Sequence, residues 1–139
     1  MVWNYTSDLE GNHKYYQGHS GAINHLIVVD GKIVLTASAD KSIRRWVAKK
    51  DKAQHIFLGH TAAVNMLATL VDSLFASAGD DKTVRIWDYS VKKECIHVLE
   101  GHDSRVTQLA YLRGPSLLAS GSDDGTARIW SKEDGFRCL

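Results

Sequence analysis

Residues 77–88 read SAGDDKTVRIWD, and this stretch decides the fold of the chain. A short apolar run leads into a tight Asp-Lys turn, and a second run ends at Trp87. Two related stretches flank it: residues 36–46 read TASADKSIRRW, and residues 120–130 read SGSDDGTARIW. Short β-branched and aromatic runs on both sides of an Asp-containing turn predict a pair of antiparallel strands in each stretch.

The three stretches share polar residues at fixed distances from their tryptophans. Each has an Asp six residues before the Trp, one hydroxyl residue ten before it and another four before it (Ser42, Thr83 and Thr126). A Gly-His pair lies upstream, with its His 27, 27 and 28 residues before the Trp. In chain order the shared sets are His19, Thr36, Asp40 and Trp46; His60, Ser77, Asp81 and Trp87; and His102, Ser120, Asp124 and Trp130. This self-similar period indicates a repeat architecture.

Strand patterns dominate each period, and no segment keeps the apolar spacing of a helix for three turns. Four short strands for every period of about 40 residues are typical of a β-propeller blade. The predicted strands are residues 22–29, 32–37, 42–47 and 54–58; 64–70, 74–77, 83–87 and 95–99; and 106–111, 117–120, 126–130 and 136–139.

The Gly-His pair, the Asp turn and the Trp or Trp-Asp ending resemble the WD-repeat (WD40) family of β-propellers. Each motif alone is weak, but three copies in phase are specific. The resemblance covers residues 18–130 directly. It implies an all-β chain of three four-stranded blades in an incomplete ring. The implied units are residues 18–58, 59–100 and 101–139, preceded by residues 1–17 as the end of an earlier blade.

Residues 1–17 match the end of a repeat rather than its beginning. Residues 1–5 align with residues 85–89, and residues 13–17 align with residues 95–99. We therefore expect the chain to open at the end of a third strand. It then supplies the fourth strand of a blade that it does not otherwise contain.

The resemblance implies that the three polar sets are structural tetrads. In such a tetrad the indole N–H donates to the hydroxyl, the hydroxyl meets the imidazole, and the Asp holds the other imidazole nitrogen. A buried Trp N–H and a buried His both need such partners. A Ser, a His and an Asp within reach of one another also fit a hydrolase. A nucleophile is not needed three times at one period, so we predict no catalytic residue and a non-enzymatic protein.

Metal and cofactor sites are not indicated. Three of the seven histidines belong to the repeats and the others are scattered, and no cysteine pair has zinc-site spacing. No Gly-rich phosphate-binding loop is present. Asp80-Asp81 and Asp123-Asp124 are paired carboxylates, but the second member of each pair belongs to a tetrad. We expect neither a metal nor a cofactor.

Composition argues against nucleic acid and membranes as partners. The chain has 17 basic and 16 acidic residues, no apolar run of membrane-spanning length and no signal-like N-terminus. Cys95 and Cys138 each follow a repeat Trp by eight residues, so they hold equivalent places on neighbouring units and are expected to be free, buried or half-buried thiols. These features favour a soluble intracellular protein, cytoplasmic with the nucleus as the alternative.

The resemblance also implies a face for protein partners, where the Gly-His loops and the turns between second and third strands emerge. The exposed positions are three and five residues after the repeat His and the one before the tetrad Asp. They are Ala22, Asn24 and Ala39; Ala63, Asn65 and Asp80; and Arg105, Thr107 and Asp123. Six of these are polar and are the candidate partner-binding residues: Asn24, Asn65, Asp80, Arg105, Thr107 and Asp123. Arg105 and the acids are preferred because charge adds selectivity, and ordinary solvated surface is the alternative.

The predicted function is a protein–protein interaction scaffold. The alternatives are a structural, self-assembling propeller piece and an accessory propeller of an enzyme or ubiquitin-ligase complex. Three blades would leave two sheet faces exposed, rich in Ile, Val, Leu and Trp, so we expect part of a longer propeller or a homo-oligomer. Two chains would give six blades.

Arg45 departs from the repeat pattern, since Ile86 and Ile129 stand at its place in the other units. On a face turned to a neighbouring blade an arginine must extend to solvent or find an acid. The alternative is that Arg45 marks a face left open.

Overall fold

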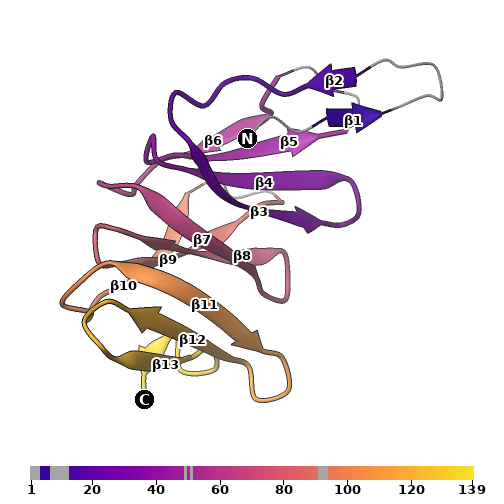
Figure 1. The fold of residues 1–139 in the computed structure, drawn as a ribbon. Helices are drawn as coiled ribbons and strands as arrows, with labels where there is room; N and C mark the ends of the chain where they lie inside the picture. The colour runs from indigo at the N-terminus through magenta and orange to yellow at the C-terminus, as the bar shows by residue number, and fades with distance from the viewer. Residues whose placement is uncertain (1–3, 7–12, 49, 51, 91–93) are drawn as a thin grey trace.

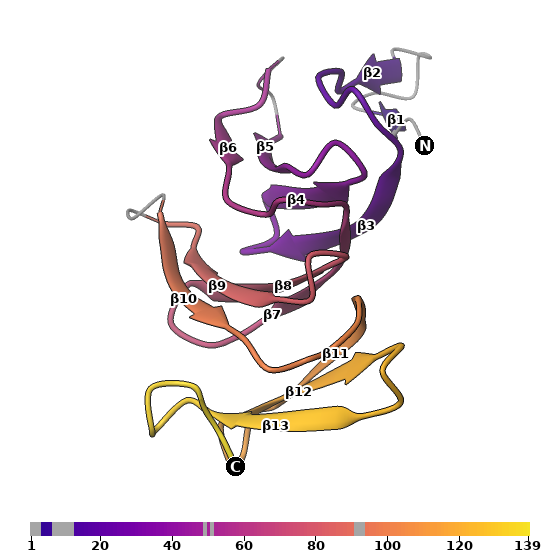
Figure 2. The ribbon, with the colours of Figure 1, turned by 90° about the vertical axis from the view of Figure 1, so that its left-hand side faces the viewer.

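A computed structural model describes residues 4–6, 13–48, 50, 52–90 and 94–139. These residues form strands and no helix, so none of their elements is a helix long and apolar enough to cross a membrane. The strands build a two-stranded sheet and three four-stranded antiparallel sheets. The three larger sheets stack one after another (Figure 1) in an arc that does not close into a ring (Figure 2). The predicted fold class is confirmed.

Each larger sheet is one blade, in which strands that follow one another in the chain pair side by side. Blade 1 consists of β3 (Ile23–Val29), β4 (Ile33–Ser38), β5 (Ile43–Val47) and β6 (His55–Phe57). Blade 2 consists of β7 (Val64–Thr69), β8 (Leu74–Gly79), β9 (Val84–Asp88) and β10 (Cys95–Leu99). Blade 3 consists of β11 (Val106–Leu112), β12 (Leu117–Ser122), β13 (Ala127–Ser131) and β14 (Arg137–Cys138).

A separate hairpin, β1 (Asn4–Thr6) and β2 (His13–Tyr15), precedes blade 1. Residues 1–3, part of the predicted third-strand end, lie outside the described residues. The predicted alignment would place His13 opposite residue 3, but the structure pairs His13 with Thr6, three residues further along. The predicted register is therefore wrong. Register is set by neighbouring strands and by a buried face, and this hairpin pairs with no third strand among the described residues.

Tyr16, directly after β2, performs the packing expected of a fourth strand. Its ring lies 5.5 Å from that of Trp46, much as the ring of Phe57 lies 5.7 Å from that of Trp87. The predicted alignment gave this place to Gln17, one residue further along, and Gln17 is exposed. A one-residue slip moves a side chain to the other face of a strand, so this part of the alignment is also wrong.

Two separate apolar cores fill the spaces between blades, and each forms from facing sides of two sheets. The core between blades 1 and 2 includes Phe57, Phe75 and Trp87, and the core between blades 2 and 3 includes Ile86 and Trp130. The Trp of each later blade thus faces the preceding blade. By the same orientation, Trp46 belongs to the side of blade 1 turned away from blade 2.

The two end faces of the stack differ from each other. The outer face of blade 1, turned away from blade 2, carries Trp46, Val34 and the half-exposed Val28 beside an apolar pocket of about 200 Å³. The outer face of blade 3, turned away from blade 2, carries the exposed Ala110, Ala127 and Leu112. The expectation of an end face containing Trp is wrong for blade 3, because Trp130 points into the core shared with blade 2.

A three-residue turn joins the second and third strands of every blade. In blade 2 the Lys82 N–H donates to the Gly79 carbonyl at 3.3 Å, and the Gly79 N–H donates to the Thr83 carbonyl at 3.1 Å. Lys82 has a φ of 70°, in the left-handed region that this type of hairpin loop requires at its third residue. The turn holds Asp81 at the end of the blade, beside the Gly-His loop.

Candidate functional site

The shared polar residues of blade 2 form one continuous chain of hydrogen bonds. The indole Nε1–H of Trp87 donates to the Ser77 hydroxyl at 2.8 Å. That hydroxyl lies 2.6 Å from Nε2 of His60, and Nδ1 of His60 lies 2.8 Å from a carboxylate oxygen of Asp81. The other oxygen of Asp81 accepts from the Thr83 hydroxyl at 2.8 Å. The chain links β9, β8, the Gly-His loop and the Asp turn.

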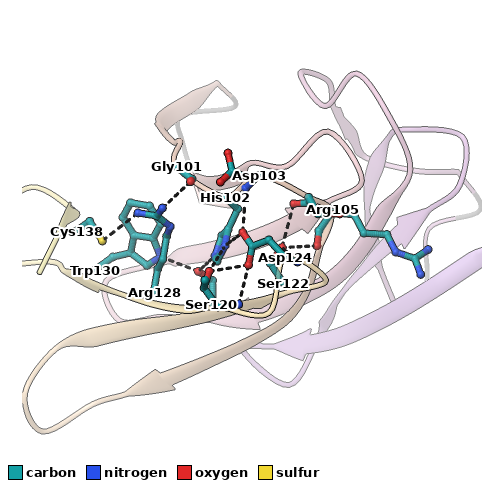
Figure 3. A network of polar contacts seen from close by, with 12 residues as sticks. Gly101, His102, Asp103, Arg105, Ser120, Ser122, Asp124, Arg128, Trp130 and Cys138 are labelled. Carbon is teal, nitrogen blue, oxygen red and sulfur yellow. Dashed lines mark hydrogen bonds and ion pairs between the residues drawn. The ribbon is translucent and has the colours of Figure 1, made fainter.

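Blades 1 and 3 repeat this arrangement. In blade 1 the three distances, from Trp to hydroxyl, hydroxyl to His and His to Asp, are 2.8, 2.7 and 2.8 Å. In blade 3 they are 2.9, 2.8 and 2.9 Å, and Figure 3 shows this network. The structure thus brings together all twelve residues of the three sets: His19, Thr36, Asp40 and Trp46; His60, Ser77, Asp81 and Trp87; and His102, Ser120, Asp124 and Trp130.

The direction of the bonds follows from the donors available. Trp can only donate, so the Ser77 oxygen accepts from Trp87 and turns its own hydrogen to Nε2 of His60. Nδ1–H of His60 then donates to Asp81. The Ser77 side chain is fully buried. This hydroxyl differs from a hydrolase nucleophile, because it is closed off from solvent and one of its lone pairs is occupied by an indole N–H.

The tetrad carboxylates are held in their ionised form. Burial alone would raise the carboxyl pKa of Asp81, but the bonds from His60, Thr83 and the Thr61 amide outweigh burial, and its pKa is well below its usual range. Asp40 shows the same balance, with Ser42 and His19 as its side-chain donors. Each carboxylate thus stabilises two loops at once, at the turn end of its blade.

An arginine completes each unit, and sequence reasoning missed it. Arg128 packs over the glycine of the Gly-His pair and donates from Nη2 to the Gly101 carbonyl at 2.6 Å (Figure 3). A Cβ on Gly101 would lie 2.9 Å from the guanidinium, and φ at this glycine is 143°. The recurrence of Arg two residues before every repeat Trp was the available signal: Arg44, Arg85 and Arg128.

Comparison with protein families matches three stretches of the chain to the WD domain, G-beta repeat: residues 12–46, 51–88 and 93–131. The chain belongs to the WD40 family. None of the curated proteins with which it was compared matches it. The matched stretches are out of phase with the blades: the second and third each contain the fourth strand of one blade and the first three strands of the next, whereas the first contains β2 and the first three strands of blade 1. The second and third WD40 repeats therefore each link two neighbouring blades covalently.

Two candidate partner-binding residues turn out to link blades. In every first strand the register shifts at one residue, which produces a β-bulge at Asn24, Asn65 and Thr107. The amide of Asn24 donates to the Val64 carbonyl of the next blade at 2.9 Å. Asn65 donates to the Val106 carbonyl at 3.0 Å and to Asp80 at 2.7 Å. Their recurrence at one place was a sequence signal, but the sequence does not show which way a bulged side chain points.

The charged candidates lie at the turn face, defined as the end of the blades formed by the Gly-His loops and the Asp turns. Arg105 and Asp123 form an ion pair at 2.5 Å with both side chains about half exposed. The hydrogen bond to Asp123, followed by the negative charges of Asp123 and Asp80, raises the pKa of Arg105. The remaining positions there are alanines: the exposed Ala22 and Ala39 and the half-buried Ala63.

Arg45 does not mark an open face. It lies on the side of β5 that carries Ile43, a residue of the core shared by blades 1 and 2. Its side chain is half-buried, and its Nε is buried without a hydrogen bond among the described residues. The prediction that this position faces a neighbouring blade agrees with the structure, whereas the open-face alternative is wrong.

The two cysteines and the residues that could bind a metal were the remaining candidates from the sequence. Both thiols are free, and Cys95 is half-buried, but Cys138 is exposed rather than buried as expected. Burial raises the pKa of the Cys95 thiol, and nearby Arg85 opposes that shift. Within the part of the chain that the structure describes, no group of His, Cys, Asp and Glu could hold a metal ion.

Proposed function

We propose that the chain is a non-enzymatic protein-interaction scaffold that contacts its partner through the turn face. WD40 repeats indicate an interaction domain of this type. The observation that carries the proposal is the exposed Arg105–Asp123 pair with Asp80 nearby. These charges lie at the turn face, and the tetrad carboxylates beside them are committed to internal hydrogen bonds.

Charge at such a site contributes selectivity and association rate. A partner that carries an acidic group opposite Arg105 and a basic group opposite Asp80 would replace the exposed ion pair with contacts of its own. Thr107 is not part of this proposed contact, because it stands at a β-bulge like Asn24 and Asn65, whose side chains bond to the next blade. We also propose an intracellular location, cytoplasmic or nuclear, which the two free cysteines support.

The test compares charge reversals on two exposed arginines. Arg105→Glu changes the turn face, whereas Arg113→Glu places the same change in the β11–β12 loop at the opposite end of blade 3. Proteins captured by the wild type should be lost with Arg105→Glu and retained with Arg113→Glu. A captured partner, once purified, should bind Arg105→Glu about fivefold or more weakly. Neither change should alter the melting temperature.

Equal capture by all three forms would contradict the proposal, as would loss that follows Arg113→Glu alone. A partner that is instead sensitive to β6 or β10 would place the binding site at the outer edge of the blades.

A second candidate function is self-assembly of the propeller. The observation that favours it is the apolar pocket on the outer face of blade 1, which the exposed Val28 and the buried Trp46 line. Exposed apolar surface beside such a pocket can mark an interaction site.

A further inference from the structure

Two consecutive side chains connect blade 1 to blade 2. Asn24 donates from Nδ2 to the Val64 carbonyl at 2.9 Å, and Nδ1 of His25 accepts from the Leu67 N–H at 3.2 Å. One side chain of blade 1 therefore donates to a backbone carbonyl of blade 2. The next side chain of blade 1 accepts from a backbone N–H of blade 2 that lies three residues after that carbonyl.

The same connection recurs one blade further on. Asn65 donates to the Val106 carbonyl at 3.0 Å, and the sulfur of Met66 accepts from the Leu109 N–H at 3.2 Å. The spacing of carbonyl and N–H is again three residues. Two independent interfaces thus share one rule, although the accepting side chain changes from His to Met.

Blade 3 carries the next pair of such side chains. Thr107 stands at the bulge, where its hydroxyl can donate, and Gln108 follows with a carboxamide oxygen that can accept. No described residue forms a hydrogen bond with either side chain, and Gln108 is exposed. Around them the outer face of blade 3 presents small apolar residues, among them Ala110 and Ala127, and Leu112 is 48 % exposed.

Blade 1 carries the complementary groups on its outer face. The bulge in β3 occupies the same place as the bulges in β7 and β11, so the Ile23 carbonyl and the Leu26 N–H correspond to the carbonyls and amides accepted by the two internal interfaces. Ile23 and Leu26 are only half-buried, whereas Val64 and Leu67 are 0 % and 1 % exposed. The apolar pocket beside Trp46 adjoins Ile23.

We propose that the outer face of blade 3 binds the outer face of blade 1 of a second copy of this chain, head to tail. Thr107 donates to the partner copy's Ile23 carbonyl, and Gln108 accepts from its Leu26 N–H. The joint continues the rule of the two internal interfaces, and one chain carries both halves of it. This inference rests on the proposed self-assembly, but it is independent of the turn-face scaffold.

The N-terminal hairpin shapes the joint. Tyr16 already occupies the place beside Trp46 that a fourth-strand residue takes in the internal interface. An incoming blade 3 therefore docks through β11, β12 and β13, and its β14, only two residues long, is displaced or bent aside. The small side chains of blade 3 suit this close approach of two sheets.

The test uses two variants, each of which carries a new charge on one of the two outer faces so that this face can no longer bind. Ala110→Arg charges the outer face of blade 3, and Val28→Arg charges the outer face of blade 1; both positions are exposed, so the fold should survive. Light scattering after size exclusion should give the wild type a mass above 15.4 kDa that rises with concentration. Each variant alone should be a monomer. An equimolar mixture should form a one-to-one complex, because one free face of each kind remains.

The matched control is Val98→Arg, which adds the same charge at an exposed position of β10 away from both end faces. It should associate like the wild type. A blade 3 to blade 3 contact would instead leave Val28→Arg self-associated and give no mixed complex, which would overturn the head-to-tail joint.

The hydrogen-bond rule is tested at Gln108. Gln108→Leu should weaken the mixed complex about 2- to 10-fold, as expected for one lost hydrogen bond. Gln108→Met, which copies the acceptor found at Met66, should bind like the wild type. Equal affinity of all three forms would overturn the role of Gln108. A wild type that remains a 15.4 kDa monomer at high micromolar concentration would overturn the head-to-tail joint. In that case a partner that no longer binds Arg105→Glu would still establish the scaffold function.

Discussion

The two internal interfaces share their backbone geometry and differ in the side chains that fill them. Between blades 1 and 2 the core is aromatic: Phe57 packs edge-on against Phe75 at 5.1 Å and against Trp87 at 5.7 Å. Between blades 2 and 3 the corresponding places beside Trp130 hold the aliphatic Leu99 and Leu118. The first interface also includes His25, whereas Met66 takes that place in the second. The bulge and its amide therefore set how blades join, and the packing is free to vary.

The largest expected effect comes from the residue three before the repeat His in each interface. Phe57 is 1 % exposed and Leu99 is 6 % exposed. Phe57→Ala should lower the free energy of unfolding by about 3–5 kcal/mol, and Leu99→Ala by about 2–3 kcal/mol, because the larger side chain leaves the larger cavity. Urea titration followed by tryptophan fluorescence measures both. Equal losses would show that the aromatic cluster adds nothing beyond an aliphatic core.

The tetrads should contribute comparably to both interfaces. His60→Ala and His102→Ala each leave a buried hydroxyl without its partner, and each should cost about 1–3 kcal/mol of stability. Asp81→Ala should fall in the same range. Thermal and chemical unfolding provide the measurement. If His60→Ala kept wild-type stability and lost a hydrolytic activity, the structural role would be wrong.

The pH dependence should separate the two interfaces. Burial lowers the pKa of His25 in the folded chain, and its Nδ1 must be unprotonated to accept from Leu67. Because the folded pKa lies below the unfolded one, the stability it adds is present above about pH 6.5 and is lost as pH falls. His25→Met, which copies Met66, should remove this loss between about pH 7 and pH 5. Melting temperatures recorded across that range decide, and identical profiles would contradict the expectation.

We expect a second loss of stability at lower pH, caused by protonation of the tetrad carboxylates and equal in the wild type and in His25→Met. Asp40 and Asp81 have pKa values well below their ordinary value of 3.8. The stability they add is present above about pH 4 and falls as the carboxylates become protonated.

The smallest expected effect concerns the Asp turns, away from both cores. Lys82 and Gly125 occupy the same left-handed position, with φ of 70° and 81°. Lys82→Gly should stabilise by roughly 0.5 kcal/mol, and Gly125→Lys should destabilise by about 1 kcal/mol, since a Cβ is strained there. Each change should add to the Phe57 or Leu99 effect when the variants are combined. Strong non-additivity would show that turn and interface are coupled.

The sequence predicted the contacts that recur inside each blade, but it did not predict the contacts between neighbouring blades. The Trp, hydroxyl, His and Asp spacings led directly to the tetrad residues, because all four lie within one period. Asn24 and Asn65 were expected to face a partner, because a strand pattern of period two does not show that a bulge redirects a side chain. The register of β2 was misjudged for a related reason, since two short strands without a third offer little pattern to align. The sequence correctly indicated that Arg45 faces a neighbouring blade. It could not predict what surrounds the Arg45 side chain, because that depends on how the next sheet packs against it.

Each core joins only adjacent sheets, so the blades behave as a short row with nearest-neighbour coupling. Among the described residues, a neighbouring blade packs against both sides of blade 2 and against one side each of blades 1 and 3. Local opening should therefore begin at the two ends and reach the middle last. Five of the six residues of β8 are buried, and β8 pairs with a strand on each edge, so its amide protons should exchange with solvent most slowly. Those of β14 and the N-terminal hairpin should exchange fastest. A partner copy at either end would extend that protection outward from the centre.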